Sequence, residues 1–115
     1  MEITLEVLFK VFFVGIAIDF VAGILAAAKE GGLKSRRCSE GMFRSFGECI
    51  VLGIFISLDY LIPQLSPYIA TFIIGFIFKE GLSIVENLVR LDVWVPDSIK
   101  KTLEVGADKV DKLNY

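Results

Sequence analysis

The chain has 115 residues, of which 55% are hydrophobic. That share exceeds the roughly 45–50% of soluble domains. Its formal net charge of −2 excludes a strong overall attraction to nucleic acid or to an acidic partner. The sequence contains no histidine, and the spacing of Cys38 and Cys49 fits no zinc or redox motif. Since it also lacks a nucleophile–base pattern and a Walker-type loop, we expect no enzyme activity, no metal and no cofactor.

The first apolar block covers residues 7–28 and predicts a transmembrane helix. Its 22 residues correspond to ~33 Å of helix at about 1.5 Å per residue. Asp19 lies near its middle. The small residues Ala26–Ala28 resemble a signal-peptide cleavage site, but the amino end is acidic and a basic stretch begins at Lys29, which favours a retained helix. We expect Gly31-Gly32 to end this helix.

Two further apolar blocks follow a basic connection at 29–45. The second helix is predicted over 46–62 and has Asp59 near its end. Prolines then bracket residues 63–67, a connection so short that it predicts a tight helical hairpin. The third helix is predicted over 68–91. The sequence therefore predicts an all-α integral membrane protein with three transmembrane helices.

The carboxyl-terminal segment has a different character. Residues 97–115 carry apolar side chains at helical spacing, at Ile99, Leu103, Ala107 and Val110. They also carry acid-before-base pairs four residues apart, which stabilise a helix. We therefore expect a membrane domain over 1–96, followed by a short cytoplasmic amphipathic helix.

The distribution of lysine and arginine predicts the orientation. Residues 29–44 contain five of them and the tail from Arg90 contains five, whereas the 63–67 hairpin has none and the amino end has only Lys10. Basic connections remain on the cytoplasmic side of a membrane. The amino terminus and the hairpin should therefore face out, and the carboxyl terminus should face in.

Polar residues inside the predicted spans are candidates for a pore or an assembly face. Ionisable groups at the bilayer centre each cost about 2.5–3.5 kcal/mol, so they need partners or water, which points to an oligomer. The third helix carries a polar stripe in steps of three and four, and the first has small residues every four positions around Asp19. For the first helix, close packing is the main interpretation and a pore-facing carboxylate is the alternative. The candidate polar face is Asp19, Asp59, Lys79, Glu80, Ser83, Glu86 and Asn87, and the candidate packing residues are Gly15, Gly23, Ala27 and Gly75.

The predicted depths of Asp19 and Lys79 in the membrane suggest that these two residues form an ion pair. Asp19 lies twelve residues from Val7, and Lys79 lies eleven from Tyr68. Both are therefore ~16–18 Å from the outer ends of their helices. Because an unpaired charge is costly in a low dielectric, we predict that Asp19 and Lys79 contact each other, within a protomer or between neighbours.

Several short segments resemble a known family. In order, they are Asp19–Gly23, Leu33–Ser35, Leu58-Asp59, Glu80–Asn87, Val95-Pro96 and Ile99–Lys101. The most specific is the glutamate–x–x–serine–isoleucine–x–glutamate–asparagine segment at 80–87. Together these segments resemble the phage lysis and toxin-secretion holins, a group that includes small holins of Gram-positive phages and holin-like exporters beside large clostridial toxins. Lys79 departs from the family pattern, in which a small or neutral polar residue is commoner.

The resemblance implies a function that involves no catalysed reaction. Holins accumulate as homo-oligomers in the bacterial cytoplasmic membrane and open lesions that release an endolysin or, in the exporter branch, a toxin. The sequence leaves two alternatives open. One is a small ion channel or transporter subunit, although no filter motif or inverted repeat is present. The other is a membrane scaffold that forms no pore.

Overall fold

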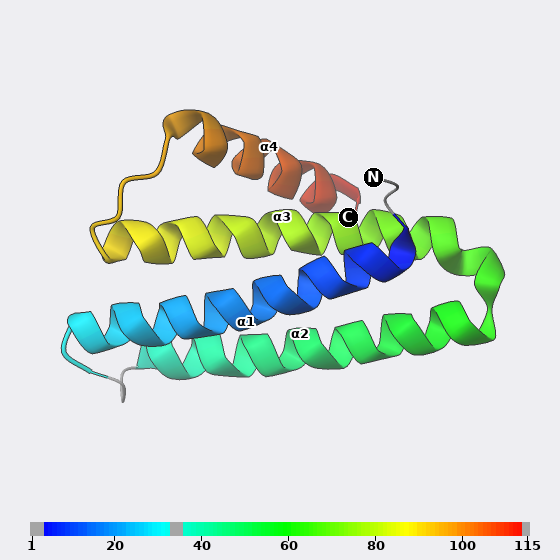
Figure 1. The fold of residues 1–115 in the computed structure, drawn as a ribbon, viewed down its shortest axis with the longest axis horizontal. Helices are drawn as coiled ribbons and strands as arrows, with labels where there is room; N and C mark the ends of the chain where they lie inside the picture. Colours follow the sequence, from blue (N-terminus) through cyan, green and yellow to red (C-terminus); the bar gives the residue numbers. More distant parts are fainter. Residues whose placement is uncertain (1–3, 33–35, 114–115) are drawn as a thin grey trace.

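The computed structural model describes residues 4–32 and 36–113, and these are almost entirely helical. Three long helices, α1 (Leu5–Lys29), α2 (Arg36–Leu61) and α3 (Ser66–Arg90), run alternately up and down. A 3-10 turn at Pro63–Leu65 joins α2 to α3, and a shorter helix, α4 (Asp97–Leu113), lies along α3 (Figure 1). This arrangement confirms the predicted all-α fold.

Three of the helical segments are long and apolar enough to cross a membrane. They are Leu5–Lys29, Cys38–Leu61 and Pro63–Arg90. The predicted start of the second helix at 46 was wrong, because α2 begins at Arg36. The polar residues at 36–45 form the first turns of this helix and are not a separate connection. Arg44 and Glu48 form an i,i+4 ion pair there at 3.6 Å. Much of the predicted 29–45 connection is therefore helix.

The ends of α1 and α3 follow from local backbone chemistry. The Thr4 hydroxyl accepts a hydrogen bond from the backbone N–H of Val7 at 3.3 Å, which caps the start of α1. Gly31 has a φ of 98°, a left-handed conformation that suits glycine, and α1 ends just before it, as predicted. Asp92 also has a positive φ, 63°, directly after α3, and the N–H of Val93 donates to the Leu88 carbonyl at 2.9 Å.

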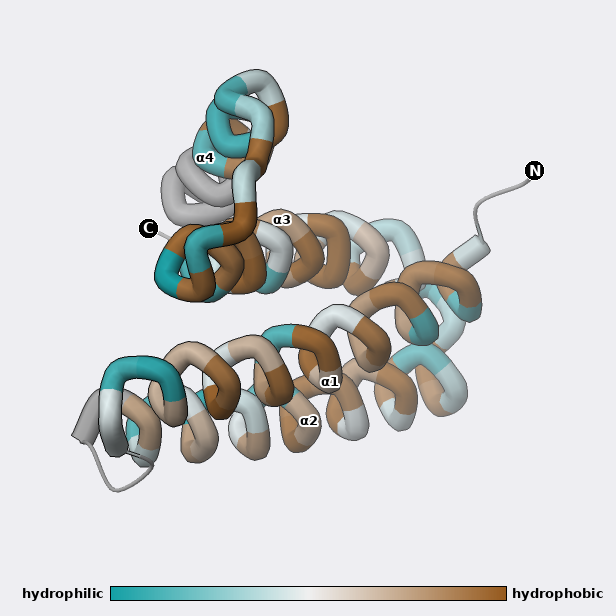
Figure 2. Tube along the Cα trace, turned by 60° about the vertical axis from the view of Figure 1, so that its left-hand side comes forward, coloured by the Kyte–Doolittle hydropathy of each residue, from teal (hydrophilic) through white to brown (hydrophobic). Residues whose placement is uncertain are grey.

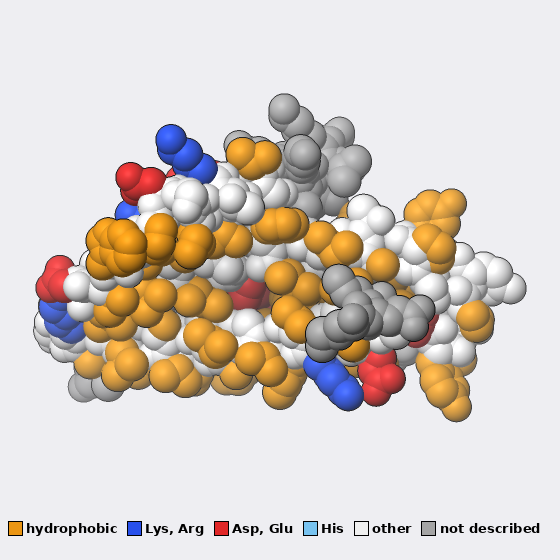
Figure 3. All heavy atoms as spheres, turned by 45° about the horizontal axis from the view of Figure 1, so that its top comes forward, with side chains coloured by type: hydrophobic (Ala, Val, Ile, Leu, Met, Phe, Trp, Pro, Cys, Tyr) orange, Lys and Arg blue, Asp and Glu red, His pale blue; other side chains and the backbone are white. Residues whose placement is uncertain are grey.

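An apolar core holds the half of the bundle nearest the α2–α3 turn. Its buried members are Phe12, Ile16, Leu52, Ile69 and Ile73. The outward sides of the long helices remain apolar, and Figure 3 shows hydrophobic side chains gathered along one face of the molecule. In a spanning helix such surfaces contact lipid, because all backbone polar groups are already satisfied within the helix.

Helix α4 packs on α3 at two glycines. A Cβ on Gly81 would lie 2.9 Å from the Leu103 side chain, and a Cβ on Gly106 would lie 2.5 Å from the Phe78 ring. Glycine at both positions therefore lets the two helices approach closely. Figure 2 shows α4 as more hydrophilic than α1. The predicted amphipathic helix is confirmed, and it lies along α3 of its own chain.

Candidate functional site

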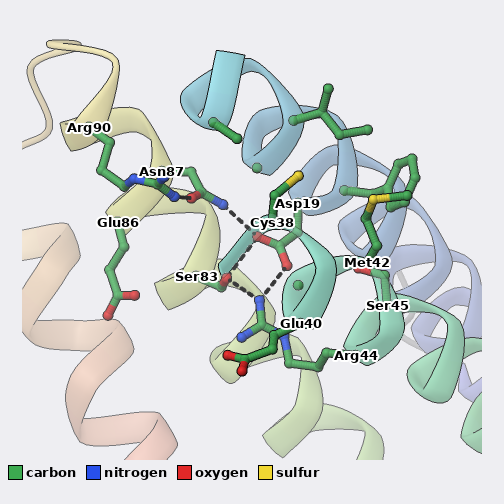
Figure 4. A pocket seen from close by; sticks show the side chains of 15 residues that line it. Asp19, Cys38, Glu40, Met42, Arg44, Ser45, Ser83, Glu86, Asn87 and Arg90 are labelled. Atoms are coloured by element: carbon green, nitrogen blue, oxygen red, sulfur yellow. Dashed lines mark hydrogen bonds and ion pairs between the residues drawn. The ribbon is translucent and has the colours of Figure 1, made fainter. Parts of the chain in front are cut away.

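Asp19 joins the three long helices. Its side chain is only 2% exposed. Its Oδ1 accepts hydrogen bonds from Ser83 Oγ at 2.8 Å and Asn87 Nδ2 at 3.0 Å, both on α3. Its Oδ2 pairs with Arg44 Nη2 of α2 at 3.2 Å, and the same nitrogen donates to Ser83 Oγ at 2.9 Å (Figure 4). Donors on α3 and α2 contact both oxygens, so the protein itself supplies hydrogen-bond partners to the carboxylate.

Small residues on α1 make room for this polar contact. Gly15 and Gly23 lie one turn to either side of Asp19. A Cβ at Gly15 would lie 3.3 Å from Glu80 Cγ, and a Cβ at Gly23 would lie 3.6 Å from Asn87 Nδ2. Ala27 and Gly75, the other candidate packing residues, are both buried. The structure thus places Gly15 and Gly23 against α3, where small side chains allow close approach. For Ala27 and Gly75 the packing role stays a prediction.

A second polar cluster ties the end of α1 to the end of α3. Arg90 binds the Glu30 carboxylate through two hydrogen bonds of 2.8 Å each, and it donates to Asn87 Oδ1 at 2.9 Å. The Lys29 ammonium donates to the Arg90 carbonyl at 3.1 Å and pairs with Asp92. Asn87 belongs to both clusters, so the two form one continuous network.

A polar cavity of about 260 Å³ opens beside Asp19 between the three long helices. It is large enough to hold water molecules, and its lining supplies hydrogen-bond partners for them. Side chains from α1, α2 and α3 converge on it (Figure 4). Its polar lining residues are Asp19, Glu40, Arg44, Ser45, Ser83, Glu86, Asn87 and Arg90.

The other candidate polar residues are distributed over different surroundings. Glu80 is buried, 4% exposed, and faces α1 at Gly15. Glu86 is exposed, and its carboxylate points away from Asp19 toward α4 (Figure 4). Asp59 lies at the opposite end of the bundle and accepts a hydrogen bond from Ser66 Oγ. The predicted polar face is therefore not one surface within the protomer.

The predicted contact between Asp19 and Lys79 within a protomer was wrong, because the cation that pairs with Asp19 is Arg44. The reason is the stagger of α1 against α3. Asp19 lies level with Ser83 and Asn87, about one helical turn, or ~6 Å, beyond Lys79. The contact between neighbouring protomers stays a prediction.

Sequence reasoning missed the part that Arg44 plays. Arg44 was counted among the charges of the basic connection, where it predicts orientation and no contact. Its distance of four residues from Glu48 is a helical signal. Extending the second helix back through that pair would have placed Arg44 on the helix, not in a connection.

Comparison with known proteins identifies the family. Residues 3–107 match the bacteriophage holin family. A protein of Bacillus phage phi105 described as "Probable holin" is 30% identical over 88 residues, covering 76% of this chain and 65% of the phage protein. An uncharacterised protein of Listeria monocytogenes is 26% identical over 98 residues, covering 85% of this chain and 70% of its own length.

A Clostridium perfringens protein, described as uncharacterised and encoded in the nagH 3' region, is 30% identical over 90 residues, covering 77% of this chain and 68% of that protein. No solved structure matches the chain. The family match spans all three candidate membrane helices and most of α4. The chain is therefore a multi-pass membrane protein that belongs to the bacteriophage holin family.

Proposed function

We propose that this chain is a holin-type pore former that oligomerises in the bacterial cytoplasmic membrane and permeabilises it. The observation that carries the proposal is the Asp19 cluster, in which polar groups of three membrane-length helices satisfy one another beside an open polar cavity. The similarity to the phage phi105 protein supports an endolysin as the released cargo, with a toxin as the alternative.

The cluster provides two ways to satisfy the same polar groups. In the single bundle, Ser83, Asn87 and Arg44 satisfy Asp19 and keep it away from lipid. In an assembly, the same groups can bind water or a neighbouring protomer instead. Exposure to the bilayer centre costs about 2.5–3.5 kcal/mol per ionisable group, so both arrangements are favoured over lipid contact.

Helix α2 is the element best placed to move between these arrangements. Its backbone lies close to α1 and approaches α3 at few places, so its contacts with α3 are made mainly by long side chains such as Phe55 and Arg44. Near the middle of the bundle it reaches α3 through the Arg44–Ser83 hydrogen bond of 2.9 Å. The Arg44 side chain is 57% exposed, so this link lies at the surface of the single bundle. Separation of α2 from α3 around Arg44 would open the polar cavity, while the ring contacts of Phe55 with Phe72 and Phe76 join the two helices in the apolar half.

Release from liposomes tests the proposal. Purified protein added to liposomes should release a large folded protein or dextran as well as a small dye. Release of ions alone would support a small channel, and sealed liposomes would support a scaffold; either result contradicts the proposal. The matched control is Lys10→Met, which removes only an exposed ion pair with Glu6 at 3.3 Å and should release cargo like the wild type.

We further propose that the amino terminus faces out and the carboxyl terminus of the membrane domain faces in. The alternating helices support this orientation, since the α2–α3 turn lies at the same end as the start of α1 and the basic connection lies at the other (Figure 1). The end that is rich in lysine and arginine should remain on the cytoplasmic side, which gives the proposed orientation.

Cysteine labelling checks the orientation. Native Cys38 is buried, 8% exposed, so its failure to react would not report its side of the membrane. Exposed positions Gln64 and Ser39 are better probes, each as a single cysteine in a chain with Cys38→Ser and Cys49→Ser. On intact cells, a membrane-impermeant maleimide should label Gln64→Cys and should reach Ser39→Cys only after permeabilisation. The reverse pattern would contradict the proposed orientation.

A further inference from the structure

Two buried carboxyl groups lack a complete set of hydrogen-bond partners. Glu80 of α3 is 4% exposed, and its Oε1 has no partner among the described residues. The Glu48 side chain of α2 is 13% exposed, and its Oε2 likewise has no partner among them. A buried polar atom without a partner costs about 1–3 kcal/mol, and more when charged. Two such atoms at one helix contact require a physical explanation.

The two groups lie together at the centre of the bundle. The Glu80 carboxyl lies within interacting distance of the carboxyl groups of Glu48 and Asp19. Arg44 is the cation in the same contact, with Nη2 at 3.2 Å from Asp19 and Nε at 3.6 Å from Glu48. The guanidinium thus pairs with two of these carboxyl groups, Asp19 and Glu48, and Glu80 lies beside both without an ion pair to Arg44 among the described residues.

The donors are unequally divided among the three. Asp19 receives the hydrogen bonds of Ser83 and Asn87 and the closer contact with Arg44, which fits an ionised carboxylate. Glu48 retains only the longer Arg44 contact. Glu40 of α2 lines the same cavity as Asp19 and Arg44. Lys100 and Glu104 of α4 line a separate hollow on another side of α3, and Lys79 is rotated by about 100° from Glu80 around the helix.

We infer that Glu48 and Glu80 hold one proton between them, as a carboxylic acid that donates a hydrogen bond to a carboxylate. The shared proton supplies the donor that this contact lacks and removes one negative charge from the bundle centre. Like charges so close in an apolar setting do not both remain ionised. A metal ion is a poorer occupant, because no group of Asp, Glu or Cys among the described residues is arranged to hold one.

The inferred site joins α2 to α3, the two long helices whose backbones approach each other at the fewest places. Loss of the proton would leave two carboxylates facing each other and would push these helices apart. The bundle therefore gains a contact whose strength depends on pH. This inference concerns the single folded chain, so it can hold or fail independently of the proposed pore.

Infrared spectroscopy of the purified protein in micelles at neutral pH tests the site. A protonated carboxyl gives a C=O stretching band that carboxylates lack. The wild type should show this band, and both Glu80→Gln and Glu48→Gln should lose it, because a glutamine amide donates to the remaining carboxylate. The matched control Glu86→Gln alters an exposed glutamate of the same helix and should keep the band. Absence of the band in the wild type, or its survival in either glutamine variant, would overturn the inference.

Stability against pH gives a second measurement that needs no variant. A proton bound by the folded bundle and not by the unfolded chain stabilises the bundle, so stability should fall as pH rises through the titration of the site. The infrared band should disappear over the same pH range as the loss of stability. Stability that stays constant while the band disappears would contradict a shared proton that joins α2 to α3.

Discussion

Replacing Arg44 by methionine should destabilise the helix bundle by about 3 kcal/mol, at the lower end of the 3–5 kcal/mol typical of a broken buried pair. The substitution leaves the Asp19 carboxylate, 2% exposed, without its cation. The lower end applies because Arg44 itself is 57% exposed, so water can enter and partly replace it. Unfolding in mixed detergent micelles, followed by circular dichroism, measures the change.

An exposed ion pair provides the control. The pair formed by Lys10 and Glu6 has side chains 73% and 78% exposed, so Lys10→Met should change stability by no more than about 0.5 kcal/mol. The exchange Asp19→Arg with Arg44→Asp should recover part of the stability lost in Arg44→Met, because it restores opposite charges across the same contact. Equal losses in Arg44→Met and Lys10→Met would show that the Asp19 contact does not hold the bundle together.

Replacing Glu86 by leucine should abolish dye release from liposomes and remove the crosslinked oligomer ladder. Glu86 is exposed and points away from Asp19, so its loss leaves the hydrogen bonds within the protomer intact (Figure 4). The change removes a polar group that is available to neighbours or to water. Membrane insertion should be unchanged or improved, since an ionisable group is removed from a candidate membrane span.

The matched control for this substitution is Val89→Leu. Val89 is 46% exposed, lies on the same helix and is already apolar. It should therefore insert, crosslink and release dye like the wild type. Normal release and normal ladders in Glu86→Leu would mean that this carboxylate takes no part in assembly.

The helices themselves were largely predictable because their signals are local. Gly31 has the positive φ that ends α1, and the prolines at 63 and 67 bracket the turn before α3. The start of α2 was missed because hydropathy places a span at its apolar part, whereas the helix also includes the charged turn around Arg44. Helix propensity and i,i+4 pairing, not hydropathy, determine that boundary.

The partners of Asp19 were not predictable from one sequence. They depend on the stagger between α1 and α3, which is set by the fit of Gly15 against Glu80 and of Gly23 against Asn87. Counting residues from the outer end of each helix places Asp19 level with Lys79. The packed helices are shifted by about one turn relative to that alignment. The sequence therefore identified Asp19 as a charged candidate, but its hydrogen-bond and ion-pair partners could be identified only from the packed structure.

The docking of α4 limits what α3 can present to a bilayer. Gly81 and Phe78 of α3 are covered by Leu103 and Gly106 of α4, and α4 carries exposed charges at Lys101 and Glu104. Acyl chains cannot reach that strip of α3 while α4 occupies it, and they would meet charged side chains if they surrounded both helices. Docking of α4 and lipid contact along the strip therefore exclude each other. The fraction of molecules with α4 docked determines how much of α3 is available to the membrane.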